Sequence, residues 1–337
     1  MSDVAASRFQ EAWQRIRQEI GKVIVGNQEV VDGVLTCFFA GGHALLEGLP
    51  GLGKTLLVKT LADSLHARFA RIQFTPDLMP TDITGTMIVA EEDGRRELRF
   101  QHGPVFTNVL LADEINRATP KTQSALLEAM AEASVTVGGT RHQLPDPFLV
   151  LGTQNPIEME GTYPLPEAQL DRFFLKLLVP FPDLAELGSI VDRTTGVEEA
   201  HASRVIEASE VRELRRLVRE VPVAAPVKEY ALRIVLGLHP ESALAHDATK
   251  KSVRYGPSPR GAQALMLASK LRALSLGRAH VAFEDVRFAV LPALRHRVLL
   301  SFEGEASGVT ADGVIGEVVK GTRELSLDAE REAVARA

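Results

Sequence analysis

Hydrophobic residues follow two kinds of pattern along the chain, and the pattern changes near residue 180. Before that point, short apolar runs alternate with segments in which apolar residues recur at helical spacing. A nearly continuous apolar run is typical of a strand that is covered on both faces. The predicted strands span residues 43–47, 70–74, 108–112, 148–152 and 174–179, and helices are predicted at 55–65 and 119–133. This alternation favours an α/β fold with a parallel five-stranded sheet between helices.

Two segments interrupt the alternation with hairpin patterns. The runs 86–89 and 98–101 flank the dipeptide Asp93-Gly94, and the runs 134–137 and 140–144 flank Gly138-Gly139. Such dipeptides between extended segments are typical of tight β-turns. We therefore predict two β-hairpins inserted into the α/β core.

The ends of the chain are predicted to be helical. Near the N-terminus, Phe9, Trp13, Ile16 and Ile20 recur at helical spacing and predict a helix packed on a core. After Phe181-Pro182-Asp183 three further apolar stripes follow, the first with Ser209 as a possible N-cap, the second after Pro226 and the third closed by Gly277. The pattern predicts two domains: an α/β core over residues 1–182 and an all-helical domain over residues 183–337.

Composition narrows the classes of function. With 337 residues, 45% of them hydrophobic, the chain is long enough for two packed domains. The net charge of −6 disfavours a general binder of nucleic acid, which needs clustered Lys and Arg. The single cysteine, Cys37, excludes an internal disulfide framework. No signal peptide and no apolar run of about 20 residues is evident, so we expect a cytoplasmic protein without stable membrane binding.

The strongest chemical motif is the stretch Gly48-Leu49-Pro50-Gly51-Leu52-Gly53-Lys54-Thr55. It fits the P-loop pattern and lies between a predicted strand and a predicted helix, which is the context that the motif requires. Its glycines let backbone N–H groups converge on phosphate oxygens at the positive end of a helix. Lys54 is expected to reach the β- and γ-phosphates, and the Thr55 hydroxyl to bind Mg²⁺. The alternative is an ordinary glycine turn before a helix.

An acidic pair, Asp113 and Glu114, follows the predicted strand 108–112. By itself, such a pair is usually a solvated strand end. Downstream of a P-loop, Asp113 is expected to hold Mg²⁺, directly or through water, and Glu114 to polarise the attacking water. Because adjacent strand residues point to opposite faces, we expect the two carboxylates to have distinct roles.

Three other polar residues are weaker candidates. Asn155 follows the predicted strand 148–152, where an amide could hold the lytic water or the γ-phosphate, although Asn155-Pro156 is also a turn signal. Arg172 precedes the last predicted strand, and Arg260 stands where a helix begins. Most arginines are solvated or paired at the surface, so spacing alone favours neither of them.

Together these residues resemble the MoxR family of AAA+ ATPases. The resemblance rests on the stretch from Leu111 to Ala118 with Pro120-Lys121-Thr122-Gln123, on the stretch from Thr153 to Phe173, and on Leu294-Arg295-His296-Arg297-Val298. It extends over nearly the whole chain, from Ile24 to about Ala306. The fold that it implies is a P-loop NTPase (AAA+) core followed by a helical lid domain.

The resemblance also implies roles for individual residues. Asn155 matches sensor 1, Arg172 the arginine finger that acts on ATP bound by a neighbouring subunit, and Arg260 sensor 2 on the lid. The turn Val25–Gly26 matches the part of the pocket that meets adenine. The nucleotide-binding residues expected on this basis are Val25, Gly26, Gly48, Pro50, Gly51, Leu52, Gly53, Lys54, Thr55, Leu56 and Asp113. The two hairpins match the helix-2 insert and the pre-sensor-1 hairpin, which face the central pore in this group.

The family implies ATP and Mg²⁺ as cofactors, a homo-oligomeric ring, most simply a hexamer, and a partner with a von Willebrand factor type A domain. The function that it implies is chaperone-like remodelling, activation or metal-cofactor insertion of client proteins. Two alternatives stay open. One is a nucleotide-dependent assembly switch that hydrolyses ATP slowly, and the other is a nucleic-acid-dependent motor, against which the acidic balance counts.

Overall fold

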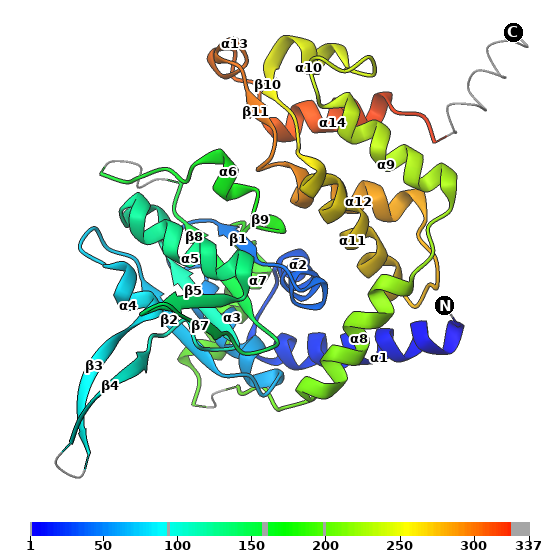
Figure 1. Cartoon of the computed structure of the whole chain (residues 1–337). Helices are drawn as coiled ribbons and strands as arrows, with labels where there is room; N and C mark the ends of the chain where they lie inside the picture. Colours follow the sequence, from blue (N-terminus) through cyan, green and yellow to red (C-terminus); the bar gives the residue numbers. More distant parts are fainter. Residues whose placement is uncertain (1, 93–94, 157–160, 198–199, 325–337) are drawn as a thin grey trace, which may run out of the picture. The chain divides into compact units, whose positions relative to one another are not determined.

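The computed structural model describes residues 2–92, 95–156, 161–197 and 200–324 (Figure 1). The chain divides into two compact units. The first, which we call the α/β unit, consists of residues 15–173 and 177–212, and the second, the C-terminal unit, of residues 1–14, 174–176 and 213 onwards. Helices α1 (Asp3–Val23) and α8 (Ala208–Glu220) contribute residues to both units.

Four strands of a five-stranded parallel sheet lie in the α/β unit, and the fifth, β9, has residues in both units; the strand order is β2-β5-β8-β1-β9. The strands are β1 (Ala44–Glu47), β2 (Phe69–Gln73), β5 (Val109–Asp113), β8 (Leu149–Gln154) and β9 (Leu175–Leu178). The prediction of five strands is confirmed, with ends that differ by one or two residues. In β5 and β8 nearly every residue is buried, as expected for strands covered on both faces.

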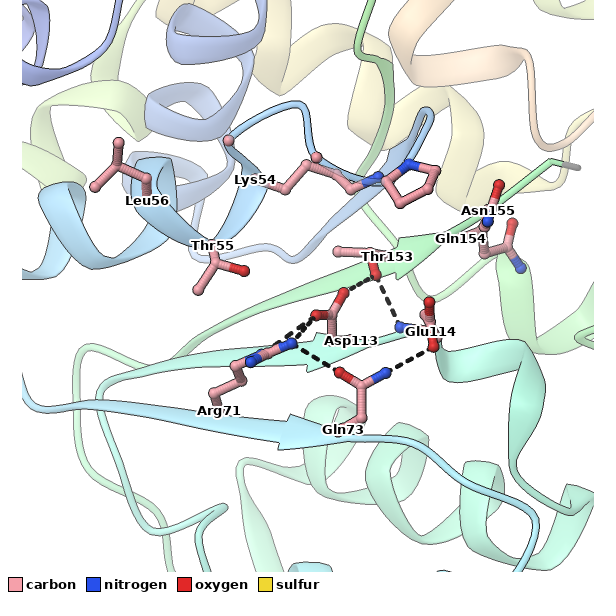
Figure 2. A pocket seen from close by; sticks show the side chains of 13 residues that line it. Lys54, Thr55, Leu56, Arg71, Gln73, Asp113, Glu114, Thr153, Gln154 and Asn155 are labelled. Carbon is pink, nitrogen blue, oxygen red and sulfur yellow. Dashed lines mark hydrogen bonds and ion pairs between the residues drawn. The ribbon is translucent and has the colours of Figure 1, made fainter. Parts of the chain in front are cut away.

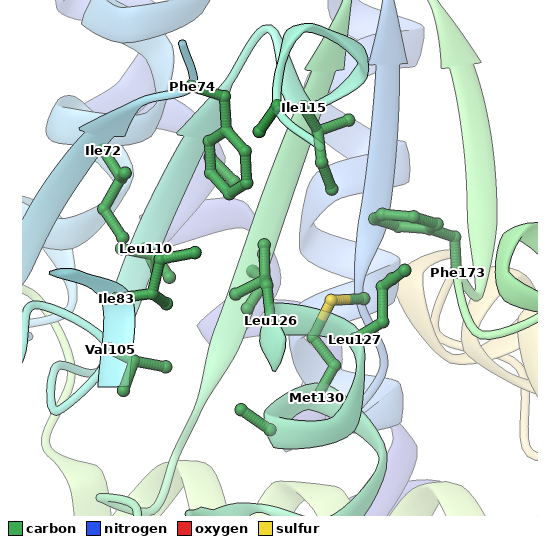
Figure 3. Packing of buried hydrophobic residues seen from close by; sticks show 14 of the residues in the cluster. Ile72, Phe74, Ile83, Val105, Leu110, Ile115, Leu126, Leu127, Met130 and Phe173 are labelled. Atoms are coloured by element: carbon green, nitrogen blue, oxygen red, sulfur yellow. The ribbon is translucent and has the colours of Figure 1, made fainter. Parts of the chain in front are cut away.

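Helices and a short 3-10 turn precede, connect and follow these strands. They are α2 (Gln28–Ala40), α3 (Lys54–Ser64), α4 (Pro80–Thr84), the 3-10 turn η1 (Ile115–Arg117), α5 (Pro120–Glu132), α6 (Glu167–Leu170) and α7 (Leu184–Thr195). Leu126, Leu127 and Met130 of α5 pack against Leu110 of β5 and Phe173 in one buried cluster (Figure 3). This layer of apolar side chains holds α5 on one face of the sheet and leaves the carboxyl ends of the strands free for polar residues.

Both predicted hairpins are present. Strands β3 (Gly85–Glu92) and β4 (Arg95–His102) pair antiparallel, and so do β6 (Ser134–Val137) and β7 (Thr140–Gln143). The dipeptide Asp93-Gly94 lies outside the described residues, whereas Gly138 and Gly139 both have the positive φ angles that a tight turn requires. Aromatic rings of both hairpins also meet, because Phe100 of β4 lies 4.1 Å from His142 of β7, centroid to centroid.

The division into units differs from the domain boundary predicted after residue 182. Residues 183–212 group with the α/β unit because hydrogen bonds attach them to it. Arg193 of α7 donates to the carbonyl oxygens of Gly21 and Lys22, at 3.1 and 2.8 Å. The Val205 amide donates to the carbonyl oxygen of Ser64 at 3.0 Å. The sequence at Phe181-Pro182-Asp183 instead marks the start of α7, where Asp183 is the N-cap.

The C-terminal unit is mainly helical. Its helices beyond α8 are α9 (Ala225–Gly237), α10 (Asp247–Ser252), α11 (Pro259–Ser275), α12 (Phe283–Leu294), α13 (Phe302–Ala306) and α14 (Ala311–Gly321). The ring of Tyr230 in α9 packs edge-on against that of Phe283 in α12, with centroids 5.3 Å apart. Gly277, at a φ angle of 74°, follows the end of α11 as predicted.

Two predictions for this part of the chain are wrong. It is not all-helical, because β10 (Val253–Tyr255) and β11 (Leu299–Leu300) form a two-stranded antiparallel sheet. Strands this short carry no periodicity that distinguishes them from loops. Ser209 is not an N-cap, because α8 already begins at Ala208 and Ser209 lies in its first turn. Within the described residues, no helix is long and apolar enough to cross a membrane.

Candidate functional site

A pocket of about 450 Å³ lies in the α/β unit at the carboxyl ends of β1, β2, β5 and β8 (Figure 2). Ligands of open α/β sheets bind at this edge of the sheet, because the loops that leave the strands there can diverge around them. The pocket is lined by Pro50, Gly51, Gly53, Lys54, Thr55, Leu56, Arg71, Gln73, Asp113, Glu114, Thr153, Gln154 and Asn155. The P-loop residues and the acidic pair, about 60 residues apart in sequence, therefore line one pocket.

The loop between β1 and α3 has the backbone of an anion cradle. Gly51 and Gly53 have φ angles of 82° and 74°, which residues other than glycine rarely adopt. A Cβ atom at either position would meet no atom within 4 Å, so the space over the backbone is open. Helix α3 begins directly afterwards at Lys54 and directs its unpaired N–H groups towards the pocket. This combination favours a phosphate group as the ligand.

The side chain of Lys54 is hydrogen-bonded to the backbone of this loop. Its Nζ donates hydrogen bonds to the carbonyl oxygens of Gly48 and Leu49, at 2.6 and 3.0 Å. Burial lowers the pKa of Lys54, while the nearby charges of Asp113 and Glu114 act in the opposite direction. Lys54 lines the pocket. Burial disfavours its charged form, and an anion bound in the pocket would favour that form again.

Asp113 and Glu114 both face the pocket, which corrects one expectation. Strand β5 ends at Asp113, and Glu114 adopts a left-handed backbone conformation with φ 56° and ψ 50°. The alternation of side chains along a strand therefore stops at Asp113, and the two carboxylates do not point to opposite faces. A left-handed conformation at a residue other than glycine costs about 1–3 kcal/mol and persists only where the surroundings enforce it.

Thr153 at the end of β8 provides part of that enforcement. Its hydroxyl accepts a hydrogen bond from the Glu114 amide at 2.8 Å and donates one to Asp113 Oδ1 at 2.6 Å. Thr153 is 2% exposed, so its hydroxyl has little access to other partners. One buried side chain thus bonds both residues of the acidic pair, through the carboxylate of Asp113 and the backbone amide of Glu114.

Four polar residues of the pocket, Arg71, Gln73, Thr153 and Gln154, were not among the site residues predicted from the sequence. Arg71 and Gln73 belong to β2, which was interpreted only as an apolar strand. Arg71 donates to Asp113 Oδ2 from Nη2 at 2.7 Å and from Nε at 3.2 Å, and Gln73 Nε2 donates to Glu114 Oε2 at 2.6 Å. The available signal was the alternation of polar and apolar residues in 70–74, which places Arg71 and Gln73 on the same face.

The residues of the pocket fit a magnesium nucleotide. Thr55 and Asp113 offer the hard oxygen ligands that Mg²⁺ prefers. No group of three or more His, Cys, Asp or Glu side chains among the described residues could bind a metal ion by itself. Mg²⁺ is commonly held by one or two carboxylates together with substrate phosphates, so the sparse protein ligand set agrees with a metal ion that binds with a nucleotide.

The remaining predicted site residues occupy different places. Asn155 lines the pocket and is buried. Val25, Gly26, Gly48 and Leu52 are not among the described residues that line it, although Gly48 begins the loop. The backbone at Gly26 is left-handed, with φ 66°, and a Cβ atom there would meet the Glu186 carboxylate of α7.

The two predicted arginines, Arg172 and Arg260, are not among the described residues that line this pocket. Arg172 donates from Nη1 to the carbonyl oxygen of Leu127 in α5 at 2.5 Å. Arg260 is exposed in the first turn of α11, where its amide donates to Ser258 Oγ at 3.1 Å. Their predicted roles as arginine finger and sensor 2 stay predictions.

Known proteins similar to this chain agree with the geometry. Residues 43–175 match the ATPase family associated with various cellular activities (AAA), and residues 245–318 match the AAA lid domain. A protein of Cytophaga hutchinsonii solved by crystallography superposes with a TM-score of 0.88 at 38% identity, over 95% of this chain and 96% of that one.

Two relatives extend the similarity over most of the chain. YeaC of Bacillus subtilis is 42% identical over 310 residues, which cover 91% of this chain and 92% of the relative. Chaperone MoxR1 of Mycobacterium tuberculosis is 41% identical over 302 residues, which cover 90% of this chain and 79% of the relative. On these similarities, and with a P-loop and an acidic pair at the end of β5 in one pocket, the chain belongs to the MoxR family of AAA+ ATPases.

Proposed function

We propose that this protein binds ATP with Mg²⁺ in the pocket of the α/β unit and hydrolyses it. The observation that carries the proposal is the meeting of Lys54 and Thr55 with Asp113 and Glu114 around one pocket. Phosphoryl transfer to water needs a cradle for the phosphates, a ligand for Mg²⁺ and a group that positions the water. The pocket contains a residue suited to each task.

The chemistry divides among these side chains. Lys54 would neutralise charge on the β- and γ-phosphates, and the backbone amides of the glycine loop would bind their oxygens. Thr55 and Asp113 would hold Mg²⁺, which offsets phosphate charge when bound. Glu114 would orient the attacking water and accept its proton, and Asn155 would hold that water or the γ-phosphate. All of these side chains belong to residues that line the pocket.

The finer assignments follow from the family and belong to the same proposal. The protein would form a ring, most simply a hexamer, in which Arg172 of one subunit completes the site of its neighbour. Arg260 of the lid would contact the phosphates as sensor 2, and Val25 and Gly26 would border adenine. The pairing of Arg172 with Leu127, away from the pocket of its own chain, is compatible with action on a neighbouring subunit.

The work done by hydrolysis would be chaperone-like. A relative at 41% identity carries the name Chaperone MoxR1, which supports remodelling or activation of client proteins. We further propose a cytoplasmic location and a partner with a von Willebrand factor type A domain. Insertion of a metal cofactor into client proteins belongs to the same proposal.

Two variants test the ATPase assignment. Lys54→Ala removes the charge that faces the phosphates and should abolish nucleotide binding. Glu114→Gln keeps the shape of the side chain but is a poor base, so it should bind ATP normally and lose turnover by about 10²-fold or more. The measurements are equilibrium binding of a fluorescent ATP analogue and phosphate release. Near-normal ATP affinity of Lys54→Ala, or wild-type turnover of Glu114→Gln, would refute these assignments.

A mixing experiment tests the trans arginine. Arg172→Ala should bind ATP and hydrolyse it about 10³-fold more slowly, the usual contribution of an arginine finger. Lys54→Ala subunits lack ATP but can donate Arg172, so mixed rings should regain turnover that neither variant has alone. If the mixture stays inactive although subunits exchange, Arg172 does not act in trans.

A further inference from the structure

Arg71 forms an ion pair with the carboxylate that is expected to hold the metal ion. Its Nη2 and Nε atoms lie 2.7 and 3.2 Å from Asp113 Oδ2, and Thr153 donates to the other oxygen, Oδ1 (Figure 2). Both oxygens of Asp113 therefore have hydrogen-bond donors. The side chain of Asp113 is 15% exposed, so the pair is shielded from water mainly on the side of the carboxylate.

The position of Arg71 is a consequence of the strand order. In the parallel pairing of β2 with β5, Arg71 lies beside Leu111 and Gln73 beside Asp113. Arg71 thus reaches Asp113 diagonally, along the face of the sheet opposite to the one that Ile72 covers in the buried cluster. Its guanidinium lines the same pocket as Lys54 and Thr55.

A positive charge at this place resembles that of a bound cation. A guanidinium that contacts a carboxylate oxygen balances the negative charge of the carboxylate and donates hydrogen bonds to that oxygen. A metal ion balances the same charge through coordination. Arg71 also has a second acceptor, because its Nη2 donates to Gln73 Oε1 at 2.8 Å. The same Nη2 atom therefore has one contact, to Gln73, that does not involve the carboxylate.

We propose that Arg71 is an internal counter-ion that occupies Asp113 in the metal-free site and competes with Mg²⁺ for this carboxylate. In the metal-free protein Arg71 neutralises Asp113, which limits repulsion between this carboxylate and incoming phosphates. When Mg²⁺ binds, Arg71 withdraws from Oδ2 and keeps its hydrogen bond to Gln73. Arg71 thereby reduces the amount by which Mg²⁺ strengthens nucleotide binding. The inference rests on the proposed function, because it requires a nucleotide in this pocket.

The test measures the Mg²⁺ enhancement, which is the Kd of a fluorescent non-hydrolysable ATP analogue in EDTA divided by its Kd in saturating Mg²⁺. Arg71→Met keeps much of the length of the side chain and removes its charge. An exposed or half-exposed ion pair contributes up to about 1 kcal/mol, so the enhancement should rise roughly fivefold relative to the wild type. Arg71→Lys retains the charge without the planar fork and should give an enhancement between the two.

Controls separate the possible outcomes. Arg141→Met also removes one cation from the α/β unit, but Arg141 pairs with Ser134 and Glu132, and its enhancement should equal that of the wild type. If circular dichroism shows that Arg71→Met is unfolded, the Mg²⁺ enhancement of Arg71→Lys still has to exceed that of the wild type. An enhancement that changes less than twofold, or falls, would show that Arg71 only supports the structure. If the wild type itself binds no nucleotide, the proposed function fails instead.

Discussion

Thr153→Val gives the most direct test of how the acidic pair is held. The substitution keeps the branched shape of the side chain and replaces the hydroxyl with a methyl group. It removes the donor to Asp113 Oδ1, at 2.6 Å, and the acceptor of the Glu114 amide, at 2.8 Å. Because Thr153 is 2% exposed, a compensating water has little room at its side chain.

The magnitude follows from these two hydrogen bonds. A hydrogen bond to a charged group contributes about 1.5–3 kcal/mol, and a buried amide without a partner costs about 1–3 kcal/mol. Asp113 would keep Arg71 as a donor, and the Glu114 amide could turn partly towards the pocket. We therefore expect the free energy of unfolding of the α/β unit to fall by roughly 2–4 kcal/mol.

Thr153→Ser is the matched control, because it keeps the hydroxyl and loses one methyl group, worth about 1 kcal/mol. Urea unfolding gives the change in stability, and hydrogen exchange of the Glu114 amide gives a local measure of the same bond. Turnover should fall in Thr153→Val and persist in Thr153→Ser, since the left-handed conformation of Glu114 depends on the hydroxyl. Equal stability and equal exchange of the two variants would refute the reasoning.

Three further predictions concern stability. Burial lowers the pKa of Lys54, so between the lowered pKa and 10.5 the folded protein binds fewer protons than the unfolded chain, and its stability rises with pH. Lys54→Met should therefore be more stable than the wild type at pH 7, and this difference should shrink as the pH rises through that window. Thermal unfolding of both proteins from pH 7 to 10.5 measures the difference. Arg278→Ala should destabilise the C-terminal unit by about 3–5 kcal/mol in urea unfolding, because it leaves the 1% exposed carboxylate of Asp285 without its charge partner, whereas Lys320→Ala, at an exposed pair, should change stability by less than about 0.5 kcal/mol. His43→Leu should cost about 2–4 kcal/mol in the same assay, because the buried ring bonds the carbonyl oxygen of one residue in α5 and the amide of another in β8.

Local patterns in the sequence determined most of the α/β unit. Most of the central strands were predictable because nearly continuous apolar runs mark strands covered on both faces, as β5 and β8 are, whereas β2 has an alternating pattern. The glycine loop was predictable because Gly51 and Gly53 need backbone angles that few other residues adopt, and because Lys54 and Thr55 follow at the start of a helix. In each case the physical cause lies within about ten residues of chain.

Tertiary structure decided which side chains share the pocket. Arg71 and Gln73 reach the acidic pair only because β2 lies next to β5, and Thr153 does so only because β8 lies on the other side. Strand order is set by packing of whole helices against the sheet, which no short stretch of sequence records.

The backbone of Glu114 and the extent of the two units depended on the same kind of long-range contact. Glu114 keeps its left-handed conformation with an amide bonded to a residue 39 positions away, and the segment after residue 182 joins the α/β unit through hydrogen bonds from Arg193 to the end of α1. Propensity and periodicity describe what a segment can form by itself. These contacts instead arise between segments distant in sequence, so their energy appears only when the chain has folded.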